Sequence, residues 1–155
     1  SKSGFYLPNP PKDNRTFKTK NALANFFCHD ISCVSSSDKF MMMTIRSHDQ
    51  YNTTIYGLDD RYRGIRNGRR VVLMNREDLV ENDIKEGDLV DLSSDRESES
   101  VVSQSWYVVP YDIPRGNIAT YFPESNVLIP LDSVADRSNT PTSKSVPIGI
   151  KKATN

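Results

Sequence analysis

The stretch VVLMNREDLVENDIKEGDLVDLSS, residues 71 to 94, decides the fold class of this 155-residue chain. It begins with four apolar residues. It ends with a predicted strand that follows a Lys-Glu-Gly-Asp turn. Between them, Asn75 with an acidic residue three positions on predicts a helix over residues 75 to 83, with Val80 and Ile84 on one face. The order is therefore strand, short helix, glycine turn and strand.

A looser copy of this order follows, because the run from Trp106 reaches a turn at Gly116 and then a further strand. Two copies suit a small closed barrel built from two interlocked halves. Elsewhere, short runs rich in β-branched, aromatic or Met residues are separated by turn signals, which predicts a mainly β chain with one or a few short helices. The predicted strands are residues 40–45, 70–74, 89–92, 101–109, 118–122, 127–131 and 146–150.

The first part of the chain differs from the rest. Pro8, Pro10 and Pro11 stand among scattered basic residues without hydrophobic periodicity. Such a segment predicts an extended arm or linker. We therefore expect two parts, an arm over residues 1–36 and a folded domain over residues 37–155.

Charge and hydropathy exclude several classes of protein. The 20 Lys and Arg residues balance 20 Asp and Glu residues, which argues against a generic nucleic-acid-coating protein. A mean hydropathy of −0.58 with 36% hydrophobic residues is typical of a folded domain. No run approaches the ~18 apolar residues of a membrane span. We expect neither nucleic acid nor membrane as a partner.

The neutral total conceals three charged segments. Residues 46–70 hold six Arg against three Asp, whereas residues 76–99 hold ten acidic residues against three basic ones. Residues 137–155 hold four basic residues and no acidic one. We expect the basic segments to face an anionic ligand, and the acidic segment to face solvent or a neighbouring domain.

The most informative polar segment is the loop that follows the first predicted strand, residues 46–54. Nearly every side chain in it can form hydrogen bonds. Arg46 suits a phosphate, Ser47 and Thr53 suit phosphate oxygens, and Gln50 and Asn52 suit the edges of a heterocycle. The alternative is a solvated loop stabilised by its own side-chain turns. A second polar cluster at residues 132–144 has the same two interpretations.

Catalytic and metal sites are not predicted. His48 and Asp49 are adjacent, and adjacent side chains on extended chain point to opposite sides, which disfavours an acid–base pair. Cys28, His29 and Cys33 fall short of the four ligands of a structural zinc site. No dinucleotide-fold glycine motif and no phosphate-binding P-loop occurs.

Four blocks in order carry a resemblance to a known family. They are TIRSHDQYNTTIYGLDDRYRG at 44–64, the stretch at 71–94, IPRGNIATYFPESNVLIPLDS at 113–133 and SNTPTSKSVPI at 138–148. Together they resemble the C-terminal molybdopterin-dinucleotide-binding domain of molybdopterin oxidoreductases, in the formate dehydrogenase-like "oxidoreductase alpha (molybdopterin) subunit" group. The resemblance implies a double-psi β-barrel of the aspartate decarboxylase-like kind, which binds molybdopterin guanine dinucleotide jointly with upstream catalytic domains.

The resemblance also implies site residues. The polar loop would face the pterin and the phosphates, and Asn126 together with Asn139, Thr140 and Lys144 of the second polar cluster would surround the pterin. Asn75 and Asp78 would approach the nucleotide end, although a helix capping box explains both without a ligand. The candidate cofactor-binding residues are Arg46, Ser47, His48, Asp49, Gln50, Asn52, Thr53, Asn75, Asp78, Asn126, Asn139, Thr140 and Lys144.

In this family the molybdenum ligand and iron–sulfur cysteines lie in the upstream domains, so we expect this chain alone to be inactive. The parent protein would be a cytoplasmic oxidoreductase in which the cofactor performs the redox chemistry. The alternative is a double-psi barrel that binds proteins without a cofactor, as in the N-terminal domains of some AAA ATPases. A self-processing decarboxylase is disfavoured because the chain has no Gly-Ser pair.

Overall fold

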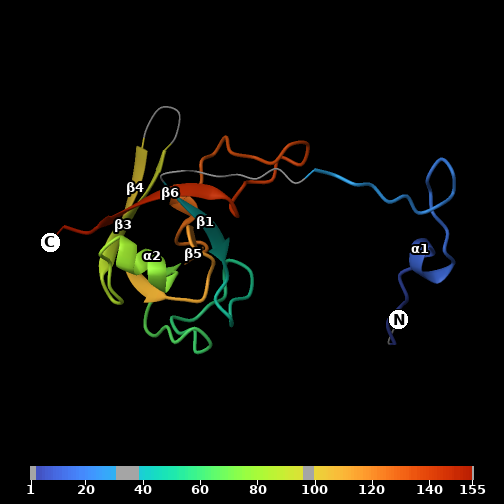
Figure 1. Ribbon diagram of the computed structural model, residues 1–155. Coiled ribbons are helices and arrows are strands. Elements are labelled where there is room, and N and C mark those ends of the chain that lie inside the picture. Colours follow the sequence, from blue (N-terminus) through green and yellow to red (C-terminus); the bar gives the residue numbers. More distant parts are fainter. Residues whose placement is uncertain (1–2, 31–38, 96–99, 155) are drawn as a thin grey trace. The chain divides into compact units, whose positions relative to one another are not determined.

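The computed structural model describes residues 3–30, 39–95 and 100–154 (Figure 1). The chain separates into two compact units, Ser1–Cys33 and Val34–Asn155. The predicted boundary at residues 36 and 37 lies outside the described residues, as does Cys33 of the disfavoured zinc set. The elements are α1 (Pro10–Asp13), β1 (Phe40–Ile45), β2 (Val71–Met74), α2 (Arg76–Glu81), β3 (Leu89–Asp95), β4 (Ser100–Pro110), β5 (Asn117–Tyr121), the 3-10 helix η1 (Asn126–Leu128) and β6 (Val146–Lys152).

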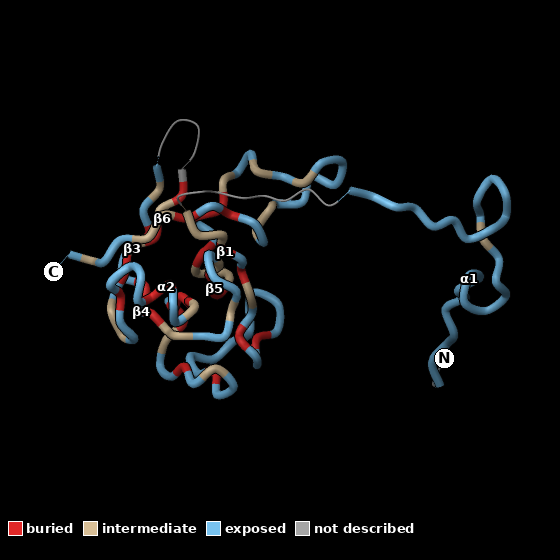
Figure 2. Tube along the Cα trace, in the orientation of Figure 1, coloured by how far each residue is buried: buried red, intermediate tan, exposed pale blue. Residues whose placement is uncertain are grey.

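The first unit has one short helix that the sequence did not predict. Asn9 caps α1 by accepting a hydrogen bond from the Lys12 amide, and proline is favourable at the first position of a helix. Every described residue of this unit is exposed except the half-buried Phe17 (Figure 2). Phe26, for example, is 97% exposed. The described part of this unit therefore has no hydrophobic core of its own.

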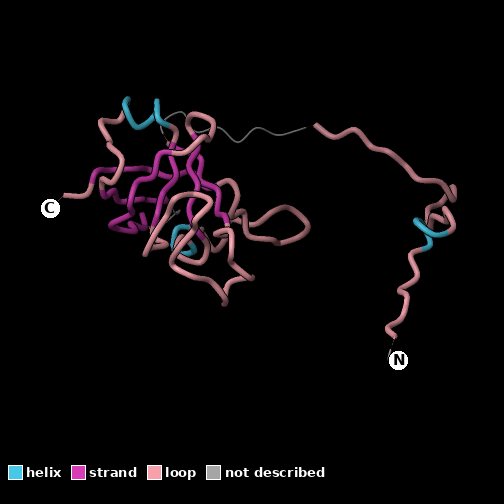
Figure 3. The backbone as a smooth tube through the Cα atoms, turned by 90° about the horizontal axis from the view of Figure 1, so that it is seen from below, coloured by secondary structure: helices cyan, strands magenta, loops and turns pink. Residues whose placement is uncertain are grey.

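The second unit is a closed six-stranded barrel with the strand order β1-β5-β2-β4-β3-β6. β1 pairs with β5 in parallel and β2 pairs with β4 in parallel, whereas the other neighbours are antiparallel. Each parallel pair therefore joins a strand of the first half of the chain to a strand of the second half, so the two halves interlock as the repeat in the sequence predicted. The predicted mainly β, double-psi β-barrel is confirmed (Figure 3).

Alternation along the strands builds the barrel interior. Successive side chains point to opposite faces, so every second residue enters the barrel. Val72 and Met74 of β2, Leu92 of β3 and Trp106 and Val108 of β4 are buried in one apolar cluster. Figure 2 shows buried segments in red on the strands of the barrel.

The intervening residues of β2 are also buried, although they face outward. Val71 and Leu73 belong to a second apolar cluster with Ile65 and Tyr121. Ile65 lies in the long loop between β1 and β2, so this loop covers the outside of the barrel beside β2 and β5. A strand that is buried on both faces reads as a continuous apolar run, which explains VVLM at residues 71–74.

Helix α2 begins as predicted, but its buried face differs. Asn75 caps it by accepting a hydrogen bond from the Glu77 amide at 2.8 Å. Val80 is 80% exposed, and Leu79 is the residue that packs with Ile84. The predicted face is wrong because the helix ends at Glu81, so helical spacing does not extend to Ile84. The turn that follows reaches β3 through Gly87, whose φ of +85° favours glycine.

The predicted strand at residues 127–131 is also wrong. This segment begins with η1, in which the Leu128 and Ile129 amides donate to the carbonyls of Ser125 and Asn126. Both apolar side chains are buried in the barrel cluster. Pro130 follows and has no amide hydrogen to donate to a strand ladder. The apolar run therefore packs into the barrel without pairing with it.

Candidate functional site

Three loops leave the barrel at one end, which we call the loop end. β1 and the parallel β5 finish there at Ile45 and Tyr121, and the antiparallel β6 starts there at Val146. The Phe122 amide donates to the Ile45 carbonyl, and the Thr44 amide donates to the Ser143 carbonyl, each at 2.9 Å. The barrel therefore brings together the polar loop, the loop after β5 and the second polar cluster.

Arg69 fastens the polar loop to the barrel. Its side chain is only 4% exposed and pairs with Glu124 at 2.6 Å. Its other nitrogens donate to Ser47 Oγ at 2.7 Å and to Gln50 Oε1 at 2.8 Å. Gln50 in turn donates to the Phe122 carbonyl at 2.8 Å. Ser47 and Gln50, two of the predicted cofactor residues, therefore use their side chains within the protein.

A second buried centre is Asp60, which is 1% exposed. Its Oδ2 accepts hydrogen bonds from Tyr121 Oη at 2.7 Å, from Arg63 Nη1 at 2.5 Å and from the His48 amide at 3.1 Å. Burial alone would raise the pKa of Asp60, but these hydrogen bonds hold it below its usual value. Burial first, and then the bond to Asp60, raise the pKa of Tyr121. The loop is thus held by an ionised carboxylate.

Three side chains of the polar loop do not take part in holding the loop, so they are free to bind a ligand. Arg46, Asn52 and Thr53 are exposed. Within the described residues their side chains form no hydrogen bond or ion pair. Asn52 also has a φ of +54°, the left-handed region that Asn tolerates. A cation, an amide and a hydroxyl on a fixed base suit the phosphates and heterocycle of a molybdopterin dinucleotide.

His48 and Asp49 lie differently from the prediction. His48 Nδ1 is 3.1 Å from Asp49 Oδ1, so the expectation that the two side chains point apart is wrong. The reason is that the chain turns here and is not extended. The His48 ring also stacks on Tyr62 with ring centroids 3.6 Å apart. The pair is half-exposed at the rim of the polar loop.

The other two loops contribute four predicted residues. Lys144 donates through Nζ to the Thr44 carbonyl, so it bridges the second polar cluster to β1. Asn126, Asn139 and Thr140 are exposed, and no hydrogen bond of their side chains occurs within the described part of the chain. Of the four, Lys144 is used within the protein and the other three are open to a ligand.

Asn75 and Asp78 lie elsewhere on the barrel. β2 is antiparallel to β5, and Met74 pairs with Ile118 near the start of β5, so Asn75 is at the end opposite the loop end. Asp78 is buried, accepts from the Gly116 amide at 2.7 Å and pairs with Arg115 at 3.2 Å. These bonds occupy Asp78 within the protein.

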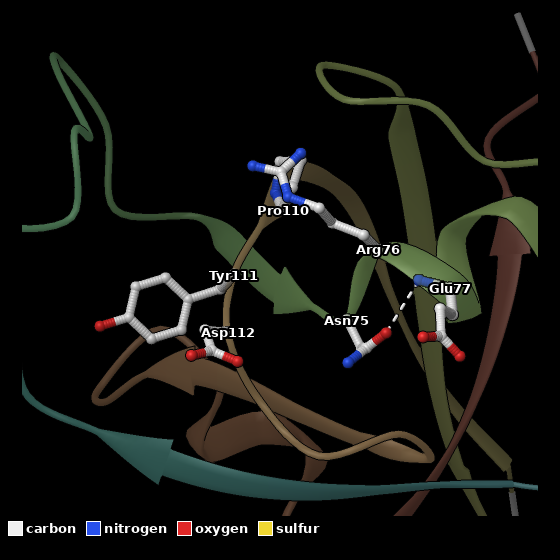
Figure 4. Close-up of a pocket in the computed structure, with 6 residues that line it drawn as sticks. All are labelled: Asn75, Arg76, Glu77, Pro110, Tyr111 and Asp112. Carbon is white, nitrogen blue, oxygen red and sulfur yellow. Dashed lines mark hydrogen bonds between the residues drawn. The ribbon is translucent and has the colours of Figure 1, made fainter.

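Asn75 borders a shallow hollow of about 460 Å³ beside the end of β4. Figure 4 shows its side chain bonded to the Glu77 amide, with Tyr111 and Asp112 on the other side. The aromatic ring of Tyr111 and the carboxylate of Asp112 therefore border this hollow, whereas Asp78 does not line it. The hollow is lined by Asn75, Arg76, Glu77, Pro110, Tyr111 and Asp112.

The sequence did not single out the residues that organise the site, namely Arg69, Asp60, Tyr121 and Glu124. Asp60 and Tyr121 are 61 positions apart, and Arg69 and Glu124 are 55 positions apart. The polar loop and the excess of Arg over residues 46–70 pointed toward this region, but neither identified these four residues. In a sequence, a charged residue that becomes buried cannot be distinguished from one on the surface, because its partner is distant in the chain.

Within residues 3–30, 39–95 and 100–154, no group of three or more His, Cys, Asp or Glu is arranged to hold a metal ion. Across the same ranges, no helix has the length and apolar character to cross a membrane.

Comparison with known proteins identifies the family. The model described as "Molydopterin dinucleotide binding domain" matches residues 40–147. The match spans more than half of the chain, from the start of β1 to the first residues of β6, and includes all three loops at the loop end. The chain therefore belongs to the molybdopterin dinucleotide binding domain family, and the family prediction is confirmed.

Some curated relatives are named as oxidoreductases, and the names of others state no activity. An uncharacterized oxidoreductase of Mycobacterium tuberculosis is 45% identical over 154 residues, which cover 96% of this chain. Protein YdeP of Escherichia coli is 38% identical over 156 residues, again 96% of this chain. The chain spans about a fifth of the length of these relatives.

Among solved structures, acetylene hydratase from Pelobacter acetylenicus is similar with a TM-score of 0.54 at 9% identity. The similarity covers 75% of this chain and 18% of that one. At this identity the likeness concerns the fold alone.

Proposed function

We propose that this chain binds a molybdopterin guanine dinucleotide as one domain of a larger, cytoplasmic oxidoreductase. The single observation that carries the proposal is the family match over residues 40–147. The loop end agrees with it, because Arg46, Asn52 and Thr53 are left open on a base fixed by buried charges. Relatives about five times as long leave room for the catalytic domains that would complete the cofactor site.

In this proposal the residues have separate tasks. Arg46 and Thr53 bind phosphate oxygens, and Asn52 binds a polar edge of the pterin. Asn126, Asn139 and Thr140 close the site from the two neighbouring loops. Ser47, Gln50 and Lys144 position these groups through Arg69 and Thr44. The bound cofactor supplies the electron transfer, and this chain supplies binding and orientation.

At the opposite end of the barrel, the hollow beside Asn75 is our proposed contact for guanine. Tyr111 offers a ring for stacking, and Asp112 offers acceptors for the guanine N1 and N2 hydrogens. Asp78 positions this region through Gly116 and Arg115. Formate is the first substrate to assay, since the sequence resembles the formate dehydrogenase-like group.

The test is the cofactor content of the full-length protein, measured as molybdenum and as guanine nucleotide released by acid. Arg46→Ala and Asn52→Gly remove the two side chains, and glycine keeps the left-handed backbone at position 52. Loss of a charged hydrogen bond costs about 1.5–3 kcal/mol, so content at limiting cofactor should fall about tenfold or more. Arg61→Ala is the control, because Arg61 is an exposed arginine of the same loop.

Equal cofactor content in all three variants and in the wild type would overturn the residue assignment. A full-length wild-type protein that carries no molybdopterin but captures protein partners through the barrel would favour the interaction module instead.

A further inference from the structure

A second basic surface lies beside the loop end, on the outer wall of the barrel. It is a cavity of about 570 Å³ between residues 63–71 of the β1–β2 loop and the second half of β4. Four arginines and one carboxylate line it, and no role has been assigned to it above. Its size falls within the range of small-molecule sites. The charged lining residues are Arg63, Arg66, Arg69, Arg70 and Glu86.

The four arginines are not equivalent. Arg63 is paired with Asp60, and Arg69 is paired with Glu124. Arg66 is exposed and forms no hydrogen bond or ion pair in the described part of the chain. Arg70 has no carboxylate partner among the same residues. Two guanidinium groups are therefore available to an anion, against the single carboxylate of Glu86.

Arg70 is held in place by neutral groups. Its Nε donates to the Gln104 carbonyl at 2.7 Å, and its Nη2 donates to Ser103 Oγ at 2.8 Å. Its guanidinium also lies 5.1 Å from the centre of the Trp106 ring. These contacts orient the group without neutralising it, which is how a preorganised anion site is built.

The opposite side of the cavity is less polar. Tyr107, Val109 and Pro110 line it, and Tyr107 is 47% exposed. An aromatic ring beside unpaired guanidinium groups suits a ligand with a flat base and a phosphate. Glu86 adds an acceptor for N–H or O–H donors of a base or sugar.

We propose that this cavity is a nucleotide site, in which Arg66 and Arg70 bind the phosphate and Tyr107 stacks on the base. The ligand is a free nucleotide, distinct from the cofactor, because the guanine of the cofactor has its proposed contact in the hollow beside Asn75. The inference therefore goes beyond the function proposed above.

The experiment titrates GMP into the 155-residue chain and measures the dissociation constant by calorimetry. Arg66→Gln changes an exposed side chain that forms no hydrogen bond or ion pair in the described structure, so folding should be unchanged. The variant should bind GMP about tenfold more weakly, because a charge-assisted phosphate contact is lost. Arg66→Gln with Arg70→Gln should bind more weakly still, and Arg61→Gln, outside the cavity, should bind like the wild type. Inorganic phosphate and guanosine should each bind more weakly than GMP.

No GMP binding by the wild-type chain, or equal binding by the Arg66→Gln and Arg61→Gln variants, would overturn the inference. The full-length protein with its cofactor bound should also bind GMP, because the cofactor does not occupy this cavity. Loss of GMP binding there would show that the cofactor fills the cavity, and it would overturn the inference. Because GMP is titrated into cofactor-free chain, failure of this inference is distinct from failure of Arg46 and Asn52 to hold the cofactor.

Discussion

The interior of the barrel and the loop between β1 and β2 are ordered by different forces. The interior is apolar, with Trp106, Leu92 and Val72 fully buried. The loop is held through two buried charged residues, Arg69 and Asp60. Apolar burial is non-directional and tolerant of shape, whereas a buried ion needs each of its partners in place. The barrel is therefore a stable frame, and the loop is a specific structure that depends on a few atoms.

The largest effect should come from Arg69→Met. The substitution keeps an apolar stem but leaves Glu124, Ser47 and Gln50 without their donor. Breaking a buried pair costs about 3–5 kcal/mol, and we expect the free energy of unfolding to fall by about 4 kcal/mol. Urea unfolding measures it, with Arg61→Met as the matched exposed control. A loss below 1 kcal/mol would show that the network does not hold the loop.

Leu92→Ala tests the other side of the comparison. Leu92 is fully buried inside the barrel, and truncation there leaves a cavity. We expect a loss of about 3 kcal/mol in the free energy of unfolding. Limited proteolysis under native conditions should show no new cleavage within residues 46–70. New cleavage there would mean that the barrel and the loop are not separately ordered.

A smaller effect is expected for Tyr121→Phe. The substitution keeps the ring in the outer apolar cluster but removes the hydrogen bond to Asp60. A hydrogen bond to a charged group contributes about 1.5–3 kcal/mol, so we expect a loss near 2 kcal/mol. Thermal unfolding at neutral pH measures it. Tyr62→Phe, on an exposed ring of the same loop, is the control and should lose much less.

The smallest effect is a pH dependence. The pKa of Asp60 is lowered in the folded protein, so its ionised form adds stability that is present above the ordinary aspartate pKa of about 3.9. That contribution is lost as the pH falls below this value toward the lowered pKa. Asp60→Asn lacks it at every pH. The stability difference between wild type and Asp60→Asn should therefore be largest near neutral pH and shrink below pH ~4. A constant difference would contradict an ionised Asp60.

The same contrast explains what the sequence predicted. Strand positions followed from short apolar runs between turn signals, and a small closed barrel followed from the repeated half-motif. The double-psi topology was implied by the family resemblance. The polar loop was found because its donors are adjacent in the chain. The failures at Val80 and at residues 127–131 arose where an apolar run packs without regular spacing or strand pairing.

The organising contacts had no local signal. Asp60 meets Tyr121 and Arg69 meets Glu124 only because β1 and β5 end together. For the same reason the sequence did not show that Ser47 and Gln50 face inward while Arg46 and Asn52 face outward. Whether a side chain faces the barrel or the solvent depends on the topology. A shift of one residue in a turn reverses this orientation.

The central claim is that the polar loop, fixed by Arg69 and Asp60, presents Arg46 and Asn52 to the cofactor. Hydrogen exchange of the full-length protein, with and without bound molybdopterin dinucleotide, tests it most directly. The account predicts that amides of residues 46–54 gain protection when the cofactor is bound, while amides of β3 and β6 change little. If the amides of residues 46–54 gain no protection and amides elsewhere on the barrel do, the claim is contradicted.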